Sequence, residues 1–453
     1  MKISRRKFLQ KTSLAAAGAI GFPYIIPSSA LGLDGTVAPS NRIVMGCIGA
    51  GGQGTWNMLA FLEQPDVQVV AICDVNEGSD DYDKLYQFEG STTAGRNPAR
   101  QRAEKYYAQQ KADGTYKGCD GYNDFRELLA RKDIDAVTVC TPDHWHGLVS
   151  IAAAKAGKDI YCEKPLVNSI PEGRAVCEAV KRYKRVLQTG SHERSGSSVR
   201  FACELVRNGR LGKLHTIRIN MPVDNQIAIG PQPTMPVPPG LDYDMWLGPT
   251  TWYPYTRRRG HFYWRYILEC GGGEMTDRGA HIIDIAQLGN NTDDSGPVKI
   301  SARGSAPRNG LFDTFDKYTF ECEYANGVRM LGGIDQPRGL KFEGTDGWVF
   351  IHIHGGRLEA EPASLLQEII RPEEIHLGRS PGHHRNFLEA IKTRNLPMAP
   401  AEVGHRTATI CHLLNIALQT ERTLQWDPVT EHVVNDEAMD RMVARPMRSP
   451  WRI

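Results

Sequence analysis

The sequence predicts an α/β chain in which a doubly wound parallel sheet is followed by an α+β domain with a largely antiparallel sheet. Two observations lead to this prediction. Up to about residue 190, short apolar runs alternate with helix-like segments, which is typical of parallel βαβ units. Beyond that point, strand-like runs follow one another across turns, as antiparallel strands do.

The parallel part is expected to occupy residues 41–190. Strands are predicted at short apolar runs, and helices at the longer amphipathic stretches between them. Residues 77–118 are polar and long for a connector, so we expect a surface insertion there. The predicted elements are strand 43–48, helix 55–64, strand 67–73, helix 99–111, helix 124–130, strand 136–140, helix 149–156 and strand 160–162.

The second part is expected to span residues 191–425, with a polar tail at 426–453 that packs across the surface. Residues 224–264 are rich in Pro, Tyr, Trp and Arg and have no periodicity, which indicates a long functional loop. The predicted elements are strand 213–223, helix 274–288, strands 298–303, 317–324, 327–334 and 348–353, and helices 383–393 and 406–420, which close the domain.

The N-terminus has the pattern of an export signal. Arg5 and Arg6 precede an uncharged stretch, 12–30, whose apolar core is too short to span a bilayer. Ser28-Ser29-Ala30 is an acceptable cleavage site. We therefore expect residues 1–30 to be a twin-arginine (Tat) signal that engages the Tat export machinery and is cleaved near Ala30, which makes the mature protein periplasmic. An uncleaved amphipathic anchor is the alternative.

Composition argues against two classes of function. The formal charge is +2 and becomes −3 without residues 1–30, so no basic bias suggests nucleic-acid binding. The ten cysteines include no Cys-x-x-Cys spacing, and Cys47, Cys73, Cys140 and Cys162 lie in or beside apolar runs. We expect free thiols, which suit a protein that folds in the cytosol before export, and no metal site.

A glycine-rich turn, Gly49-Ala50-Gly51-Gly52-Gln53-Gly54, lies between the first predicted strand and helix. Such a turn lets the backbone approach a pyrophosphate, and the following helix points its N-terminus at the phosphates. Asp74 ends the next strand, twenty residues after Gly54, where a carboxylate binds ribose hydroxyls and repels a 2′-phosphate. The sequence therefore predicts a Rossmann domain that binds NAD through Gly49, Gly51, Gly52, Gln53, Gly54 and Asp74.

Polar residues follow two later strands at their carboxyl ends, where ligands bind in open α/β sheets. In the first group we expect Thr141, Pro142, His144 and His146 to contact the cofactor and Trp145 to face the substrate. A helix-capping turn with incidental histidines is the alternative. In the second group, Glu163 and Lys164 are expected beside the cofactor, and the Lys164 ammonium is expected to hold a substrate hydroxyl. A surface salt bridge between Glu163 and Lys164 is the alternative.

Asp277 and His281 are four residues apart in a predicted helix and share one face. The ordinary pKa of histidine, about 6.5, suits a base at neutral pH, whereas that of lysine, about 10.4, does not. We expect His281 to take the hydroxyl proton and Asp277 to orient it or to bind an adjacent hydroxyl, with Asp284 behind them. Arg257, Arg259 and Trp264 are expected to bind the substrate, with a plain core position as the alternative for Trp264.

These motifs together resemble the Gfo/Idh/MocA oxidoreductases. The resemblance rests on the glycine-rich turn, on Glu163-Lys164-Pro165 and on the run from Gly271 to Asp284 that contains Asp277-Arg278-Gly279-Ala280-His281, and it spans about residues 41–425. It implies that Lys164, Asp277 and His281 form the family's catalytic Lys-Asp-His set. It also implies that the second-domain sheet makes homodimer or homotetramer contacts.

The resemblance implies an NAD-dependent enzyme that removes a hydride from a ring hydroxyl carbon of a sugar, inositol or glycoside, including the formation of 3-keto sugars. Two alternatives stay open. One is an NAD-dependent glycoside hydrolase that uses transient oxidation and elimination, and the other is a non-catalytic sugar or nucleotide sensor. The hydrolase relatives replace the Glu-Lys-Pro triplet, which is intact here, so the dehydrogenase is favoured.

Overall fold

The computed structural model describes residues 37–82, 86–223 and 227–453. Residues 1–42 and 43–453 form separate units, and the first contributes one described 3-10 helix, η1 (Pro39–Asn41). The predicted signal and its cleavage site lie outside the described residues. Among the described helices, none combines the length and the apolar character needed to cross a bilayer.

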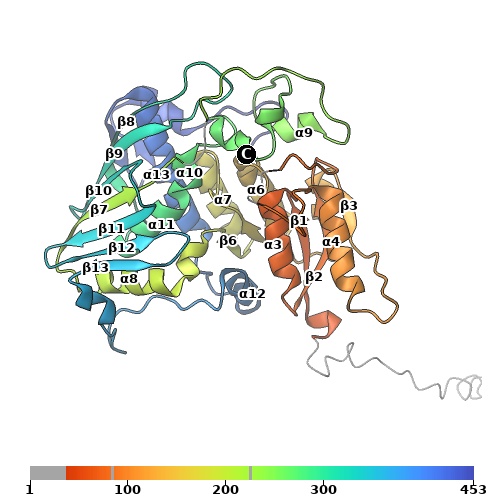
Figure 1. Ribbon diagram of the computed structural model, residues 1–453, viewed down its shortest axis with the longest axis horizontal. Helices are drawn as coiled ribbons and strands as arrows, with labels where there is room; N and C mark the ends of the chain where they lie inside the picture. Colours follow the sequence, from red (N-terminus) through yellow and green to blue (C-terminus); the bar gives the residue numbers. More distant parts are fainter. Residues whose placement is uncertain (1–36, 83–85, 224–226) are drawn as a thin grey trace, which may run out of the picture. The chain divides into compact units, whose positions relative to one another are not determined.

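The first sheet has six parallel strands in the order β3-β2-β1-β4-β5-β6 (Figure 1). The order reverses between β1 and β4, and ligands bind at such a switch point, beyond the carboxyl ends of the strands. The predicted doubly wound sheet is therefore confirmed. The strands are β1 (Ile43–Ile48), β2 (Val67–Cys73), β3 (Asp120–Tyr122), β4 (Ala136–Val139), β5 (Asp159–Cys162) and β6 (Leu187–Thr189).

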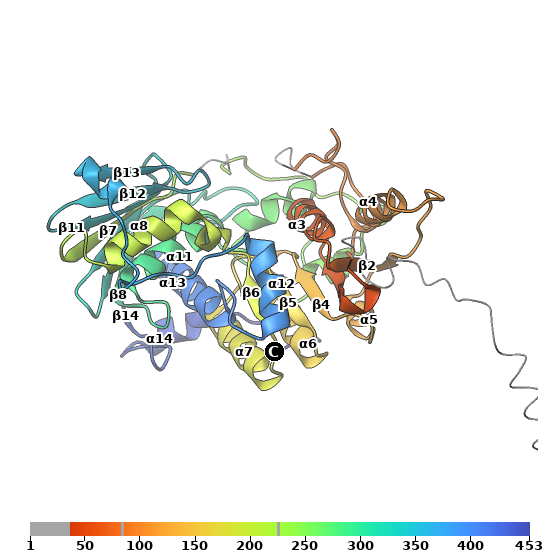
Figure 2. The ribbon, with the colours of Figure 1, turned by 90° about the horizontal axis from the view of Figure 1, so that it is seen from below.

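Helices cover both faces of this sheet, because its strands are apolar on both sides. They are α3 (Gly52–Leu62), α4 (Arg96–Ala108), α5 (Phe125–Leu129), α6 (Asp143–Lys155) and α7 (Ile170–Arg182). A sixth helix, α12 (His383–Thr393), was expected in the second domain, and that expectation is wrong. Its Phe387 packs against Phe61 and Tyr161 in the core of the first sheet. The helix itself lies beside β6 (Figure 2).

The second sheet has nine strands in the order β13-β12-β11-β7-β10-β9-β8-β14-β15, and its neighbouring strands pair antiparallel except β7 and β10, which are parallel. This confirms the predicted, largely antiparallel sheet. One face carries a large apolar core together with α8 (Ser197–Arg207), α11 (Gly279–Asn290) and α13 (Ala401–Thr420). The strands are β7 (Leu214–Asn220), β8 (Pro297–Ser305), β9 (Lys317–Tyr324), β10 (Arg329–Gly333), β11 (Gly339–Gly344), β12 (Trp348–His352), β13 (Leu358–Glu361), β14 (Leu424–Asp427) and β15 (His432–Val433).

The long loop that follows β7 has its own aromatic core, which includes Trp246, Tyr255 and Trp264. Its backbone is pinned to the first sheet next to Asp74, because Asp242 N donates to Val75 O and Glu77 N donates to Gly240 O. The loop contains α9 (Tyr243–Leu247), η3 (Arg257–Arg259) and η4 (Tyr263–Tyr266). The loop therefore covers the carboxyl edge of the parallel sheet.

The tail does more than pack across the surface, since β14 and β15 extend the second sheet. It then returns toward the first sheet, where the Trp451 ring lies 4.6 Å from that of Trp145 and Arg448 Nη1 lies 2.6 Å from Asp244 Oδ1. The remaining elements are η2 (His192–Ser195), α10 (Glu274–Asp277), η5 (Ala363–Gln367), α14 (Glu437–Asp440) and η6 (Arg441–Val443).

Candidate active site

The glycine-rich turn has the geometry of a nucleotide-binding turn. Gly49 has a φ of +84°, and a Cβ there would lie 2.5 Å from the carbonyl carbon of Cys140. A Cβ on Gly54 would lie 1.9 Å from the Gly49 carbonyl oxygen, so helix α3 can approach β1 only with glycine there. No side chain caps the N-terminus of α3, which leaves its first amides available to an anion.

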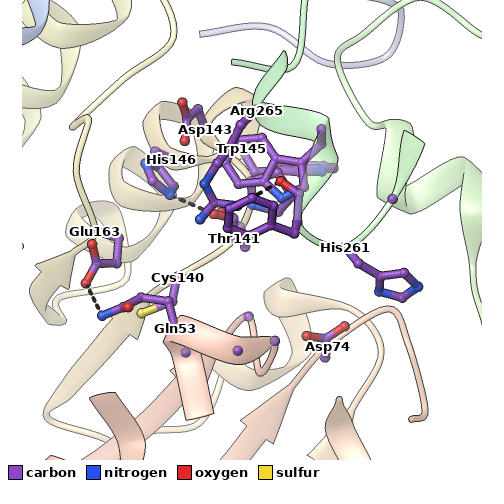
Figure 3. A pocket seen from close by; sticks show the side chains of 18 of the residues that line it. Gln53, Asp74, Cys140, Thr141, Asp143, Trp145, His146, Glu163, His261 and Arg265 are labelled. Carbon is purple, nitrogen blue, oxygen red and sulfur yellow. Dashed lines mark hydrogen bonds between the residues drawn. The ribbon is translucent and has the colours of Figure 1, made fainter. Parts of the chain in front are cut away.

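Asp74 is held at the carboxyl end of β2 beside this turn (Figure 3). Its Oδ2 accepts from Ala50 N at 2.6 Å and its Oδ1 accepts from Asn76 N at 2.8 Å. Burial raises the pKa of Asp74, and these two backbone hydrogen bonds oppose that rise. Each carboxylate oxygen can accept a further hydrogen bond, so ribose hydroxyls fit here. Arg96 Nη1 also donates to the Asp74 carbonyl, a neighbour that the sequence did not suggest.

The residues after β4 divide between two roles. Thr141, Pro142, Trp145 and His146 line the cavity, and Thr141 Oγ1 is buried without a hydrogen-bond partner in the described chain. His144 does not line that cavity. Its Nε2 lies 3.0 Å from Trp246 O, and burial lowers its pKa to about 4, so it fastens the long loop to the sheet rather than contacting the cofactor. These residues open α6, which begins earlier than predicted.

The Glu163–Lys164 pair points in two directions. Glu163 Oε1 accepts from Gln53 Nε2 at 3.1 Å and from Asn57 Nδ2 at 2.9 Å, so it steadies the start of α3 (Figure 3). Lys164 Nζ donates to Asp277 Oδ1 at 2.6 Å and to Asp277 O at 3.1 Å. The side chains of Lys164 and Asp277 are only 12% and 11% exposed. The alternative of a surface Glu163–Lys164 salt bridge is therefore wrong.

Asp277 lies among cations. Arg265 Nε is 3.5 Å from its Oδ1, and Arg278 Nε is 3.9 Å from its Oδ2. Burial favours the neutral acid, but Lys164, Arg265 and Arg278 together hold the pKa of Asp277 well below its usual range. The carboxylate is therefore ionised, and the surplus of positive charge around it suits an oxygen that develops negative charge.

His281 lines the same cavity from the next helix. Residues 274–290 form two helices, α10 and α11, rather than the single predicted helix. The helical hydrogen bonding is interrupted at Arg278, which ends α10 and precedes α11. Burial lowers the pKa of His281 well below its usual value, and Lys164, His192 and His354 lower it further, so the imidazole is neutral. Its ring centroid lies 5.3 Å from that of His192 and 4.6 Å from that of His354.

Asp284 continues along α11 but faces away from the cavity. It is fully buried, and its Oδ2 accepts from Arg194 Nε at 2.7 Å, while Thr407 Oγ1 donates to its Oδ1 at 3.0 Å. It anchors the helix that carries His281.

The glycine-rich turn, Asp74, Lys164, Asp277 and His281 line one cavity of about 590 Å³. Its wall brings together the predicted residues Gly49, Gly51, Gly52, Gln53, Gly54, Asp74, Thr141, Pro142, Trp145, His146, Glu163, Lys164, Trp264, Asp277 and His281. Arg257 and Arg259 are not part of it. Arg257 pairs with Asp81, and Arg259 is buried over the Tyr253 ring. Trp264 both lines the cavity and belongs to the aromatic core of the loop.

Sequence reasoning missed many residues of the cavity wall, among them Tyr82, Tyr86, His192, Arg265 and His354. His192 follows β6, so the rule on carboxyl ends of strands would have found it if that three-residue strand had been recognised. Tyr82 and Tyr86 come from the polar insertion and pack on Gly51 and Gly52. Nothing in the sequence pattern marks Arg265 or His354. No group of metal-ligating side chains suited to an ion occurs in the described chain.

Comparison with solved structures shows the same fold. An aldose-aldose oxidoreductase from Caulobacter crescentus, complexed with glycerol, matches with a TM-score of 0.59 and 20% identity, covering 85% of this chain and 99% of that chain. A levoglucosan dehydrogenase in complex with NADH and levoglucosan matches with a TM-score of 0.57 and 20% identity, covering 84% of this chain and 98% of that one.

Curated relatives match over shorter stretches. A myo-inositol 2-dehydrogenase from Thermotoga maritima is 34% identical over 122 residues, which is 27% of this chain and 33% of the relative. An alpha-N-acetylgalactosaminidase from Shewanella oneidensis is 27% identical over 225 residues, which is 47% of this chain and 44% of the relative. The chain thus spans less than half the length of these two relatives.

Two family descriptions match nearly the whole described chain. Residues 43–191 match the oxidoreductase family's NAD-binding Rossmann fold, and residues 216–453 match its C-terminal alpha/beta domain. Three features fit NAD as the nucleotide: the glycine-rich turn, the N-terminus of α3, which Gly51 leaves without a side-chain cap, and Asp74. The chain belongs to the Gfo/Idh/MocA family of NAD-binding oxidoreductases.

Proposed function

We propose that this protein oxidises a ring hydroxyl of a sugar, inositol or glycoside, with Lys164, Asp277 and His281 as the catalytic residues. The observation that carries the proposal is the Lys164–Asp277 ion pair of 2.6 Å, which lies in one cavity with His281 and the glycine-rich turn. The glycine-rich turn and Asp74 would hold NAD, which would supply the acceptor for the hydride of the hydroxyl carbon.

Lys164 is placed to hold the reacting hydroxyl. An ammonium has three N–H donors, and its two hydrogen bonds to Asp277 leave one donor for the substrate oxygen. As the hydroxyl loses its proton, the positive charge of Lys164 stabilises the developing alkoxide. Asp277 fixes the ammonium in position through its carboxylate and its carbonyl oxygen.

His281 is the proposed base. It is neutral because burial and the nearby Lys164 disfavour its charged form, and a neutral imidazole can accept the hydroxyl proton. In the reverse direction the same residue returns the proton to the oxygen. His192 and His354 bracket its ring and restrict its orientation.

The second candidate is an NAD-dependent glycoside hydrolase, which oxidises the sugar transiently, eliminates the aglycone, adds water and reduces the product. The match to an alpha-N-acetylgalactosaminidase favours keeping it. A non-catalytic sensor is the third candidate, and the complete Lys-Asp-His set argues against it.

One assay separates these candidates. The purified protein is incubated with NAD and p-nitrophenyl glycosides, and both NADH and free nitrophenol are followed. Net NADH supports the dehydrogenase, and nitrophenol without net NADH supports the hydrolase. If the wild type gives neither product with any of a panel of glycosides and inositols, the proposal is wrong.

A further inference from the structure

We propose that Trp56 is a stacking surface for a second ring of the substrate. The substrate class is then a glycoside in which the oxidised sugar carries a further sugar or aromatic ring. This inference rests on the proposed sugar oxidation and extends it by assigning the outer part of the cavity.

Trp56 has an unusual position for a large aromatic side chain. It lies on α3, the helix that follows the glycine-rich turn, yet it is 46% exposed. Large hydrophobic side chains that are this exposed occur elsewhere in the described chain, but Trp56 is the one among them that also lines the cavity. Trp56 therefore combines an exposed aromatic ring with a place in the cavity wall.

The neighbours of Trp56 connect it to the proposed base. The His192 ring lies 5.3 Å from the His281 ring and 6.4 Å from the Trp56 ring. His384 supports Trp56 from behind, with ring centroids 5.4 Å apart, and is itself held by Asn57 at 2.9 Å. Trp56 is therefore about one residue farther out than the group that contacts the reacting hydroxyl, which is where a second ring of a glycoside would lie.

The cavity also has polar groups suited to sugar hydroxyls. His354, from the turn after β12, lines the cavity, and its Nδ1 lies 3.1 Å from Glu193 Oε1. Arg338 also lines the cavity. A flat apolar surface with a few fixed polar groups is the usual composition of a small-molecule site, and an indole face matches the C–H face of a pyranose or the face of an aryl group.

The test measures binding, so that it does not depend on turnover. NAD-loaded wild type and three variants are titrated calorimetrically with matched pairs: methyl β-glucoside and cellobiose, methyl β-galactoside and lactose, and methyl α-glucoside and maltose. Trp56→Ala removes the surface, and Trp56→Phe keeps an aromatic face. Trp252→Ala is the matched control, because Trp252 is 56% exposed but does not line the cavity.

We expect the wild type to bind the disaccharide of at least one pair about tenfold more tightly than the methyl glycoside. Trp56→Ala should lose about that factor for the disaccharide and leave the methyl glycoside unchanged, and Trp56→Phe should fall between them. Trp252→Ala should behave as wild type. The inference is overturned if no pair shows a disaccharide preference, or if Trp56→Ala weakens both members of a pair equally.

Two further measurements separate the possible failures. Sedimentation of Trp56→Ala tests whether this side chain instead joins two copies of the chain, and a change of oligomeric state would overturn the inference. NADH formation is followed with the same ligands. If Trp56 supports disaccharide binding but no ligand reacts, the proposed function fails and the subsite stands. If sugars are oxidised without any contribution from Trp56, the subsite fails and the function stands.

Discussion

At the scale of single residues, His281 is the sharpest target. His281→Ala should lower kcat by roughly 10²–10⁴-fold, the usual contribution of a positioned proton-transfer group. NAD affinity, measured by calorimetry, should persist, because the glycine-rich turn and Asp74 remain intact. His215→Ala is the matched control, since His215 is exposed on β7 and does not line the cavity. Near wild-type turnover of His281→Ala on a confirmed substrate would contradict the assignment.

Asp143 should make stability depend on pH. Burial raises the pKa of Asp143 to about 8, although Arg265 and Lys164 oppose the rise. The folded protein therefore retains a proton that the unfolded chain releases at lower pH, so the contribution of Asp143 to stability falls as pH rises from about 4 to about 8. Asp143→Asn cannot ionise and should become more stable relative to wild type over that range.

The Asp143 effect is measured as the difference in Tm between Asp143→Asn and wild type, without added nucleotide, from pH 5 to pH 8.5. Asp294→Asn at an exposed position is the control for the substitution itself. Other buried groups titrate in both proteins and cancel in the difference. A Tm difference that does not change with pH would contradict a buried, protonated Asp143.

Asp74 should decide between NAD and NADP. Asp74→Ala removes a carboxylate that is expected to accept from the ribose, and a hydrogen bond to a charged group contributes about 1.5–3 kcal/mol. NAD affinity should fall roughly 10- to 150-fold, and the gap to NADP should narrow because the repulsion of a 2′-phosphate is also lost. Calorimetry with both nucleotides checks this. A wild type that bound NADP more tightly, using Arg96, would contradict the prediction.

Much of the candidate site could be predicted from local sequence, but not all of it. Lys164, Asp277 and His281 lie in recognisable motifs at strand and helix ends, and the cavity joins them. His144 looked equivalent to His146, yet only the folded chain shows that Trp246 and Cys270 engage it instead. His354 comes from a turn more than seventy residues after His281. Its role depends on tertiary packing that no local pattern encodes.

At the scale of elements, the segment from 257 to 266 contributes through a different arginine from those predicted. Arg265 is partly buried, lies 3.5 Å from Asp277 Oδ1 and stacks over the Trp264 ring. Arg265→Ala should lower kcat/KM by roughly 10- to 150-fold, since it removes a charged contact to the catalytic carboxylate. Arg257→Ala breaks only an exposed pair with Asp81, which solvent screens, and should leave kinetics unchanged.

Steady-state kinetics of both variants on one substrate test this comparison, with thermal unfolding to confirm that each is folded. If kcat/KM fell equally in the two variants, or fell further in Arg257→Ala, the result would indicate that Arg257 contacts the substrate.

Helices and strands could be predicted where the hydrophobic periodicity of the sequence is strong. They were harder to predict where tertiary packing determines whether a segment forms a strand or which sheet a helix covers. The apolar runs gave β1, β2, β4 and β5 directly. β3 and β6 have three residues each, too few for a pattern, and they are strands because their neighbours offer free edges. The amphipathic stretch 383–393 predicted a helix correctly but not its partner, since an apolar stripe does not specify which sheet it covers.

At the scale of the whole molecule, the chain crosses repeatedly between its two sheets. The long loop is pinned beside Asp74, α12 covers the parallel sheet, and Trp451 of the tail packs on Trp145. The last residues of the chain therefore contribute to the packing of the first sheet. All ten cysteines lie in the described chain and are unpaired.

These properties suit export in the folded state, which the twin arginines at positions 5 and 6 predict. Replacing both with lysine, as Arg5→Lys and Arg6→Lys, keeps the charge but removes the guanidinium groups, so any effect reports recognition rather than electrostatics. The double variant should stay in the cytoplasm at full length with its NAD bound, whereas the wild type should appear in the periplasm, shortened near Ala30. Cell fractionation with mass spectrometry of both pools measures location, cleavage and cofactor content together. Normal export of the double variant would rule out the Tat route, and a periplasmic wild type without nucleotide would show that the cofactor does not travel with the folded protein.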